Sequence, residues 1–160
     1  MRLKGFNYSQ SGYYFITLCA KNRKNIFGNI LNEKMHLNQF GQIIQKEWEN
    51  TPNIRKEIIL DEFIIMPDHI HGIIKINNNS TGVWQYATEY APTFFKSTSK
   101  TLGAFIRGFK GTTTKQINLI RNTPNFPLWQ RNYYERIIRN ENALNNIRNY
   151  IKNNPKNWGK

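Results

Sequence analysis

Apolar residues in the first third of the chain fall into short runs that are typical of β-strands. Residues 13–20 are rich in β-branched and aromatic side chains and follow a Ser11-Gly12 turn signal, so they predict a strand. Residues 26–30 and 34–37 are shorter apolar pieces with polar residues between them, which predicts a hairpin. This part of the chain is therefore expected to be β-structure.

Further along the chain, three more runs predict strands. Residues 58–66 are almost continuously apolar, and a Pro67-Asp68 break separates them from a second run at 69–76. These two segments are expected to pair antiparallel. A connector containing two prolines leads to a last predicted strand at residues 132–138.

Three segments instead repeat their apolar residues at helical spacing. The first begins at Asn38, a plausible N-cap, and is expected to end at Thr51-Pro52. The second covers residues 100–121, with an interruption expected near its two glycines, 108–111. The third covers residues 140–153, where Asn140 can cap the helix.

The order of these elements predicts a single α+β domain, in which helices pack on an antiparallel sheet. Its length of 160 residues suits one core, and residues 77–99 have no sustained period, so we expect a long flexible loop there. The lone Cys19 excludes an internal disulfide and a zinc site built from several thiolates.

Charge restricts the class of partner. The chain carries 23 Lys and Arg against 10 Asp and Glu, a formal net charge of +13, which favours nucleic acid or an anionic membrane surface. No apolar run is long enough to cross a membrane, and the first residues do not resemble a signal peptide. We therefore expect a cytoplasmic protein.

The candidate chemistry begins with two histidines in the predicted strand at 69–76. Side chains of a strand alternate in direction, so His69 and His71 project from one face and Ile70 from the other. Two neutral imidazoles on one face can hold a divalent cation if a third ligand joins them, and imidazole ligands alone would also suit Zn²⁺. The competing interpretation is an ordinary histidine on the sheet surface.

A second candidate group lies at the end of the last predicted helix. Tyr150 and Asn154 are four residues apart and share a helix face. A phenol becomes a nucleophile when a nearby metal or cation favours its phenolate, and an amide oxygen is a suitable hard ligand. The alternative is a packing tyrosine whose hydroxyl meets water.

These residues lie within four ordered blocks that resemble the single-tyrosine HUH transposases, above all the REP-associated tyrosine transposases. The blocks are residues 13–28 (YYFITLCAKNRKNIFG), 61–72 (DEFIIMPDHIHG), 107–110 (RGFK) and 129–155 (WQRNYYERIIRN…NYIKNNP). The resemblance covers nearly the whole chain and implies a ferredoxin-like fold. It also implies a single-stranded DNA nicking and strand-transfer enzyme, acting at hairpin-associated sites and associated with the nucleoid rather than a membrane.

The resemblance assigns the residues as follows. His69 and His71 would be the HUH metal ligands, Tyr150 the nucleophile that forms a 5′-phosphotyrosine link, and Asn154 the third ligand, where the insertion-sequence branch commonly has Gln. The cofactor would be Mg²⁺ or Mn²⁺. Tyr133 and Tyr134 are rival phenols that rank below Tyr150 because they lie on a predicted strand. A monomer and a homodimer both remain open.

Basic and aromatic residues are expected to meet the DNA. The predicted phosphate-binding residues are Arg107, Lys110, Lys115, Arg131, Arg136 and Arg139. Residues that could stack on unpaired bases from the 77–99 loop are Trp84, Tyr86, Tyr90, Phe94 and Phe95. Two other functions stay open: a catalytically idle binder of structured nucleic acid, and a metal-dependent hydrolase in which Asp68, expected to point with Ile70 or into the turn, serves as general base.

Overall fold

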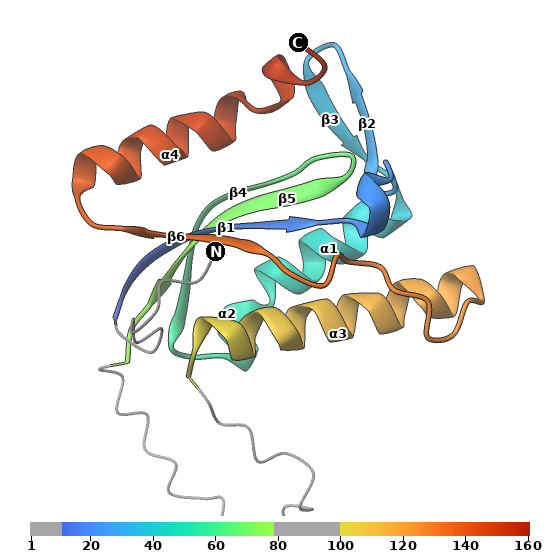
Figure 1. Cartoon of the computed structure of the whole chain (residues 1–160), viewed down its shortest axis with the longest axis horizontal. Helices are drawn as coiled ribbons and strands as arrows, with labels where there is room; N and C mark the ends of the chain where they lie inside the picture. Colours follow the sequence, from blue (N-terminus) through green and yellow to red (C-terminus); the bar gives the residue numbers. More distant parts are fainter. Residues whose placement is uncertain (1–10, 79–99) are drawn as a thin grey trace, which may run out of the picture.

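A four-stranded antiparallel sheet, ordered β4-β5-β1-β6, forms the centre of the molecule (Figure 1). Its strands are β1 (Gly12–Cys19), β4 (Ile58–Ile65), β5 (His69–Ile76) and β6 (Tyr134–Ile138). The computed structural model describes residues 11–78 and 100–160, so most of the predicted 77–99 loop, with its five aromatic residues, lies outside the described residues. The predicted antiparallel pairing of β4 with β5 is confirmed.

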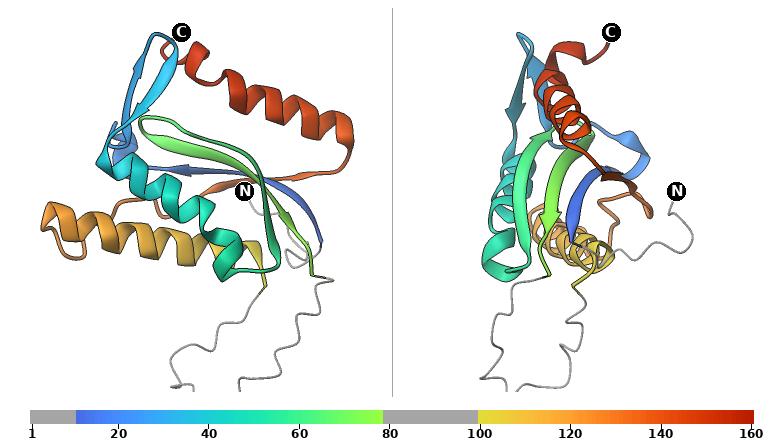
Figure 2. Two further views of the ribbon diagram at one scale, coloured as in Figure 1. Left: turned by 180° about the vertical axis from the view of Figure 1, so that it is seen from behind. Right: turned by 90° about the vertical axis from the view of Figure 1, so that its left-hand side faces the viewer.

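Helices cover both faces of this sheet. Helices α1 (Gln39–Glu49) and α3 (Leu102–Arg121) pack on one face, and α4 (Glu141–Asn153) lies across the other, as the two views of Figure 2 show. The described chain also contains the short helix α2 (Thr51–Ile54) and the 3-10 turns η1 (Lys21–Arg23) and η2 (Pro155–Asn157). The α+β prediction is confirmed. None of the described helices has the length and apolar character needed to span a membrane.

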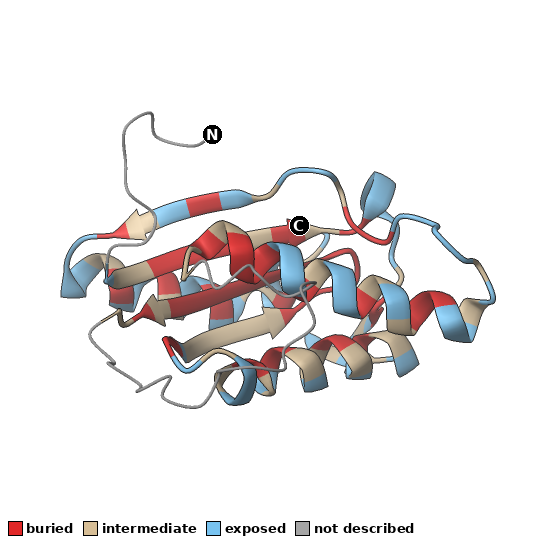
Figure 3. Ribbon diagram, turned by 90° about the horizontal axis from the view of Figure 1, so that it is seen from below, coloured by how far each residue is buried: buried red, intermediate tan, exposed pale blue. Residues whose placement is uncertain are grey.

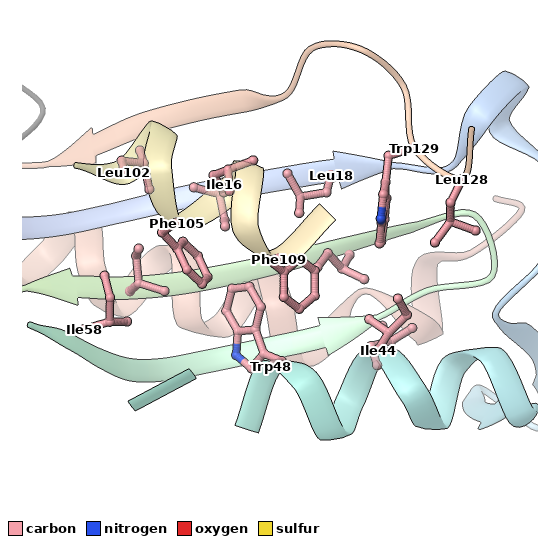
Figure 4. Packing of buried hydrophobic residues seen from close by; sticks show 14 of the residues in the cluster. Ile16, Leu18, Ile44, Trp48, Ile58, Leu102, Phe105, Phe109, Leu128 and Trp129 are labelled. Carbon is pink, nitrogen blue, oxygen red and sulfur yellow. The ribbon is translucent and has the colours of Figure 1, made fainter. Parts of the chain in front are cut away.

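The larger core lies between the sheet and helices α1 and α3. Trp48 of α1 is fully buried there, with its ring edge-on to Phe105 and Phe109 (Figure 4). The same ring also stacks on Phe63 of β4. Viewed from below, the buried positions of α1 and α3 face inward and their exposed positions face solvent (Figure 3). Burial of one such aromatic side chain contributes about 2–3 kcal/mol, and this cluster is the larger of the two cores.

A smaller core on the opposite face holds α4. Leu144, Ile147 and Ile151 form its buried stripe and pack on Phe15 and Ile73 of the central strands. Asn140 caps the helix by accepting a hydrogen bond from the amide of Ala143, as predicted. The buried stripe places α4 over β4 and β5, with Phe15 of β1 beneath it, and Asn140 fixes its first turn.

One helix prediction needs correction. Helix α3 runs without interruption through Gly108 and Gly111, because the buried Phe109 and Thr113 on its inner face outweigh the weak helix propensity of two exposed glycines. The first helix ends at Glu49, directly before Thr51-Pro52 as predicted, and Thr51-Pro52 then begins the short helix α2, since a proline in the first turn loses no hydrogen bond.

The hairpin and the last strand match the predictions closely. Strands β2 (Gly28–Leu31) and β3 (Lys34–Leu37) pair through a two-residue turn at Asn32-Glu33, where both residues have positive φ, as a tight hairpin requires. Strand β6 begins at Tyr134, two residues later than predicted, and pairs with β1.

Candidate functional site

The two histidines lie on β5, one of the two central strands, and face helix α4. Ile70 between them points into the opposite core and is fully buried, which confirms the expected alternation. His69 and His71 are themselves only 6% exposed. They are therefore part of the interior, and their polar atoms need partners.

Each imidazole is held through its Nδ1 atom. His69 Nδ1 donates to Asp68 Oδ1 at 2.5 Å, and Asp68 Oδ2 forms an ion pair with Arg23 Nε at 2.9 Å. His71 Nδ1 hydrogen-bonds with Thr17 Oγ1 of β1 at 2.7 Å. These contacts fix the ring orientations, as supporting contacts do around metal-binding histidines.

The direction of Asp68 differs from the expectation that it would point with Ile70 or into the turn. Asp68 lies in the turn before β5, where strand alternation does not apply, so its carboxylate folds back onto His69. Both carboxylate oxygens have partners, on His69 and Arg23. Asp68 is therefore not a free general base for hydrolysis by water.

The geometry of the ring pair fits a metal ion. The two Nε2 atoms lie 3.0 Å apart, and two ligands at right angles around an ion with bonds of about 2.1 Å are separated by about 3.0 Å. Burial lowers the pKa of His69, and burial followed by the charges of His69 and Arg23 lowers the pKa of His71 to about 3. Both rings are neutral near pH 7, as metal ligation requires.

A third ligand would have to be of another residue type. Among the described residues, no group of three or more His, Cys, Asp or Glu side chains is arranged to hold a metal. Asn154 lies at the end of α4, half-buried, and its recorded contacts are main-chain ones to Ile151 and Asn157. Its role as a ligand stays a prediction that the chemistry of its amide oxygen permits.

Tyr150 of α4 is the phenol that reaches the imidazoles. Its hydroxyl lies 3.4 Å from His71 Nε2, and its ring is edge-on to both His71 and Phe15. The side chain is 52% exposed, so one side of the ring faces solvent while the hydroxyl meets the histidine pair. A buried nitrogen pair and an accessible phenol from distant parts of the chain thus form one site.

The rival phenols lie elsewhere. Tyr134 is on the α4 side of β6, edge-on to Phe15, and Tyr133 packs toward the α1 and α3 core. Tyr150, by contrast, contacts His71 through both its hydroxyl and its ring.

Sequence analysis missed four residues that complete this site. Phe15 stacks on His71 at a centroid distance of 5.4 Å, Trp158 lies 6.0 Å from His69, and Thr17 and Arg23 hold the rings through the contacts at Nδ1 and Asp68. Thr17 could have been found only from the register of β1 against β5, in which it pairs with His71. Arg23 depends on the positive φ of residues 22 and 23, which no pattern signals.

The predicted DNA-binding residues divide between two faces of the sheet. Arg107, Lys110 and Arg131 line a hollow of about 590 Å³ between α3 and the segment before β6. Lys110 donates to the carbonyl oxygens of Gln130 and Asn132, and burial lowers its pKa, so this lysine also ties α3 to that segment.

The remaining basic residues lie around that hollow or beyond it. Lys115 and Arg131 line a neighbouring hollow, which reaches along the second half of α3. Arg136 pairs with Phe15 across β6 and β1, on the α4 side, and Arg139 follows β6 at the surface. The six residues therefore do not form a single line.

A histidine pair on a central antiparallel strand beneath a tyrosine-bearing last helix is the arrangement that the resemblance to HUH transposases led us to expect. A solved REP-associated tyrosine transposase bound to a REP hairpin is similar over 99% of this chain and 75% of its own, with a TM-score of 0.66 and 18% identity. A candidate transposase from Deinococcus radiodurans is similar over 96% of each chain, with a TM-score of 0.52 and 14% identity. The chain has this transposase fold.

Sequence comparison places the chain in a family. An uncharacterised protein of Haemophilus influenzae is 42% identical over 160 residues, which cover 99% of this chain and 88% of that protein. The chain belongs to the same family as this protein. No family model matches the sequence.

Proposed function

We propose that this chain is a DNA transposase-type enzyme that nicks and rejoins single strands through a 5′-phosphotyrosine intermediate. The observation that carries the proposal is the approach of the Tyr150 hydroxyl to 3.4 Å from Nε2 of the buried, neutral histidine pair. A nucleophile beside a preformed pair of metal ligands is the arrangement that phosphodiester cleavage by a tyrosine needs. The transposase fold supports the same reaction class.

The proposed cofactor is Mg²⁺ or Mn²⁺, held by His69, His71 and the amide oxygen of Asn154. When bound, the ion supplies polarisation of the scissile phosphate. Asp68 and Thr17 keep the two Nε2 lone pairs directed to the shared space, so the ligand pair needs no rearrangement.

Tyr150 performs the bond exchange. Its oxygen forms a bond to phosphorus, the bond from phosphorus to the 3′ oxygen breaks, and that oxygen takes up a proton as the 3′-hydroxyl leaves. The phenol loses its own proton to water, which can reach the half-exposed side chain. Because the link conserves the phosphodiester energy, a second 3′-hydroxyl reverses the attack, joins the strands and releases Tyr150.

DNA carrying a hairpin is the proposed substrate. The structurally similar REP-associated transposase was solved bound to a REP hairpin, and the net charge of +13 on this chain favours a polyanion. Arg107, Lys110 and Arg131 would hold phosphates in their shared hollow, with Lys115, Arg136 and Arg139 at its margins or on the tyrosine side. With such a substrate the protein would act at the nucleoid.

One chain is proposed to suffice for the reaction. The histidine pair and Tyr150 come from the same chain and already lie within 3.4 Å, so a homodimer is not needed to unite them. We further propose that the whole chain, residues 1–160, works as one catalytic domain.

The test is a covalent adduct. The chain is incubated with a 5′-labelled and a 3′-labelled hairpin oligonucleotide and Mn²⁺, and the products are separated under denaturing conditions. We expect a protein–DNA adduct that Tyr150→Phe abolishes, while the matched Tyr134→Phe variant retains it. Retention of the adduct in Tyr150→Phe would refute the assignment of the nucleophile.

The same samples distinguish the other functions. Free 5′-phosphate ends without protein attachment would indicate hydrolysis by water. Salt-sensitive binding that survives His69→Ala, with no adduct from the unaltered chain at any metal concentration, would indicate a catalytically idle binding protein.

A further inference from the structure

Strand β4 contains an irregularity directly beneath the tyrosine helix. Leu60 and Phe63 both pack into the core with α1 and α3, although residues three apart in a regular strand face opposite sides. The register explains this: Leu60 pairs with Ile74 and Phe63 with Gly72, so Asp61 and Glu62 together lie opposite the single residue Ile73. This is the two-against-one pairing of a β-bulge.

The bulge turns two consecutive acidic side chains toward α4. Arg148 binds Asp61 with two parallel hydrogen bonds, Nε to Oδ1 at 2.8 Å and Nη2 to Oδ2 at 2.6 Å, and Lys152 pairs with Glu62 at 2.8 Å. A two-pronged pair of this kind fixes the orientation of both groups as well as their distance. The Asp61 side chain is only 16% exposed, so this pair is partly shielded from solvent.

The ion pairs and the tyrosine lie on opposite flanks of the same helix. Arg148 and Lys152 are four residues apart and share a side, whereas Tyr150 is two residues from each and so lies about 200° around the helix from Arg148. The buried stripe of Leu144, Ile147 and Ile151 lies between these flanks. The ion pairs of Arg148 and Lys152 with β4 therefore oppose any rotation of α4 about its axis that would move Tyr150 on the opposite flank.

The size of this effect can be worked from helix geometry. A rotation of α4 by about 20° moves an atom about 6 Å from the helix axis by about 2 Å. The Tyr150 hydroxyl lies 3.4 Å from His71 Nε2, so such a rotation would remove the phenol from the histidine pair. Three aliphatic side chains on a sheet surface resist rolling less specifically than a two-pronged ion pair does.

We propose that Asp61 and Arg148 are positioning residues that set the rotation of α4 and thereby hold Tyr150 over the histidine pair. This inference rests on the proposed tyrosine chemistry. The pair touches no reacting atom, and its contribution is the alignment of the nucleophile, on which intramolecular reaction rates depend steeply.

The experiment measures adduct formation at saturating hairpin DNA and Mn²⁺ for Asp61→Asn, Arg148→Lys and the exchanged pair Asp61→Arg/Arg148→Asp. We expect Asp61→Asn to slow the reaction on the order of tenfold with DNA affinity unchanged. Arg148→Lys should fall between that variant and the unaltered chain, because lysine keeps the charge but not the two-pronged geometry. The exchanged pair should recover most of the lost rate.

Glu49→Gln is the matched control. It also removes one carboxylate that has a side-chain partner, but at an exposed position of α1, on the opposite face of the sheet from α4, and should leave the rate unchanged. Hydrogen exchange followed by mass spectrometry gives a readout independent of activity. Amides of α4 should exchange faster in Asp61→Asn, while those of α3 should not change.

Three outcomes would overturn the inference. If Asp61→Asn reacts at the unaltered rate, the pair does not position Tyr150, and the proposed function stands. If the unaltered chain forms no adduct, the proposed function falls together with the positioning role, even where the exchange data show that the pair stiffens α4. A slowed Asp61→Asn with α4 exchange unchanged would contradict a positioning role that acts through the rotation of this helix.

Discussion

Gly72 offers a sharp test of how closely the core beneath the histidines is packed. Its position on β5 faces the ring of Trp48, and a Cβ placed there would lie 2.4 Å from Cζ2 and 2.5 Å from Cη2 of that ring. Carbon atoms in contact need about 3.5 Å, so Gly72→Ala demands a displacement of about 1 Å. A severe overlap is therefore expected.

Neither the Gly72 backbone nor the Trp48 ring can move without a large cost in free energy. Gly72 belongs to a strand paired on both sides, with Ile16 and with Phe63, and Trp48 is enclosed by rings that include Phe105 and Phe109. Overpacking of a dense core costs about 1–3 kcal/mol. We expect Gly72→Ala to lower the free energy of unfolding by an amount near the upper end of that range.

Urea denaturation followed by circular dichroism measures the effect as a shift of the midpoint at constant slope. Gly111→Ala is the matched control, because its Cβ would meet nothing within 4 Å at an exposed position of α3, and it should stabilise the chain by about 0.5–1 kcal/mol. In a Trp48→Phe background, which removes the overlapping ring atoms, Gly72→Ala should cost much less. Equal stability of Gly72→Ala and the unaltered chain would refute this packing argument.

Two further predictions concern helix α4 and its partner strand. Asn140→Ala removes the acceptor for the Ala143 amide and should cost about 1 kcal/mol in urea denaturation, with Asn140→Asp nearly neutral; a neutral Asn140→Ala would contradict the capping role. The hydrogen bonds from Arg148 hold the pKa of Asp61 below its usual value, so their stabilisation is present above about pH 4 and is lost as pH falls through the folded-state pKa. The stability difference between the unaltered chain and Asp61→Asn should therefore shrink in acid, and a difference independent of pH would refute this linkage.

Local pattern was sufficient for most of the fold. The alternation at residues 69–76 correctly placed both histidines on one face, and the asparagines at 38 and 140 cap helices as predicted. These features depend on neighbours a few residues apart, which is the range over which periodicity and capping act. The expected interruption of α3 was wrong because burial on one helix face, a long-range effect, decided the conformation of two glycines.

The surroundings of the site depended on contacts that no local pattern records. The bulge at Asp61-Glu62 lies inside an apparently continuous strand, and its pairing with Arg148 joins residues 87 positions apart. Strand alternation could not predict the direction of the Asp68 side chain, because this residue lies in a turn. The sequence was sufficient to choose His69, His71 and Tyr150 as candidate site residues. Their proximity follows from the fold, and their chemical roles stay predictions.

The distance along the chain between His71 and Tyr150 affects when the site can exist during protein synthesis. Strands β4 and β5 are consecutive and can pair as soon as both have left the ribosome, and β1 has by then already emerged. The phenol follows 79 residues after His71 and reaches the histidines only when α4 has docked. A nascent chain thus contains the two histidines well before Tyr150 is made. Any fragment that ends before α4 has the histidine pair but not the tyrosine.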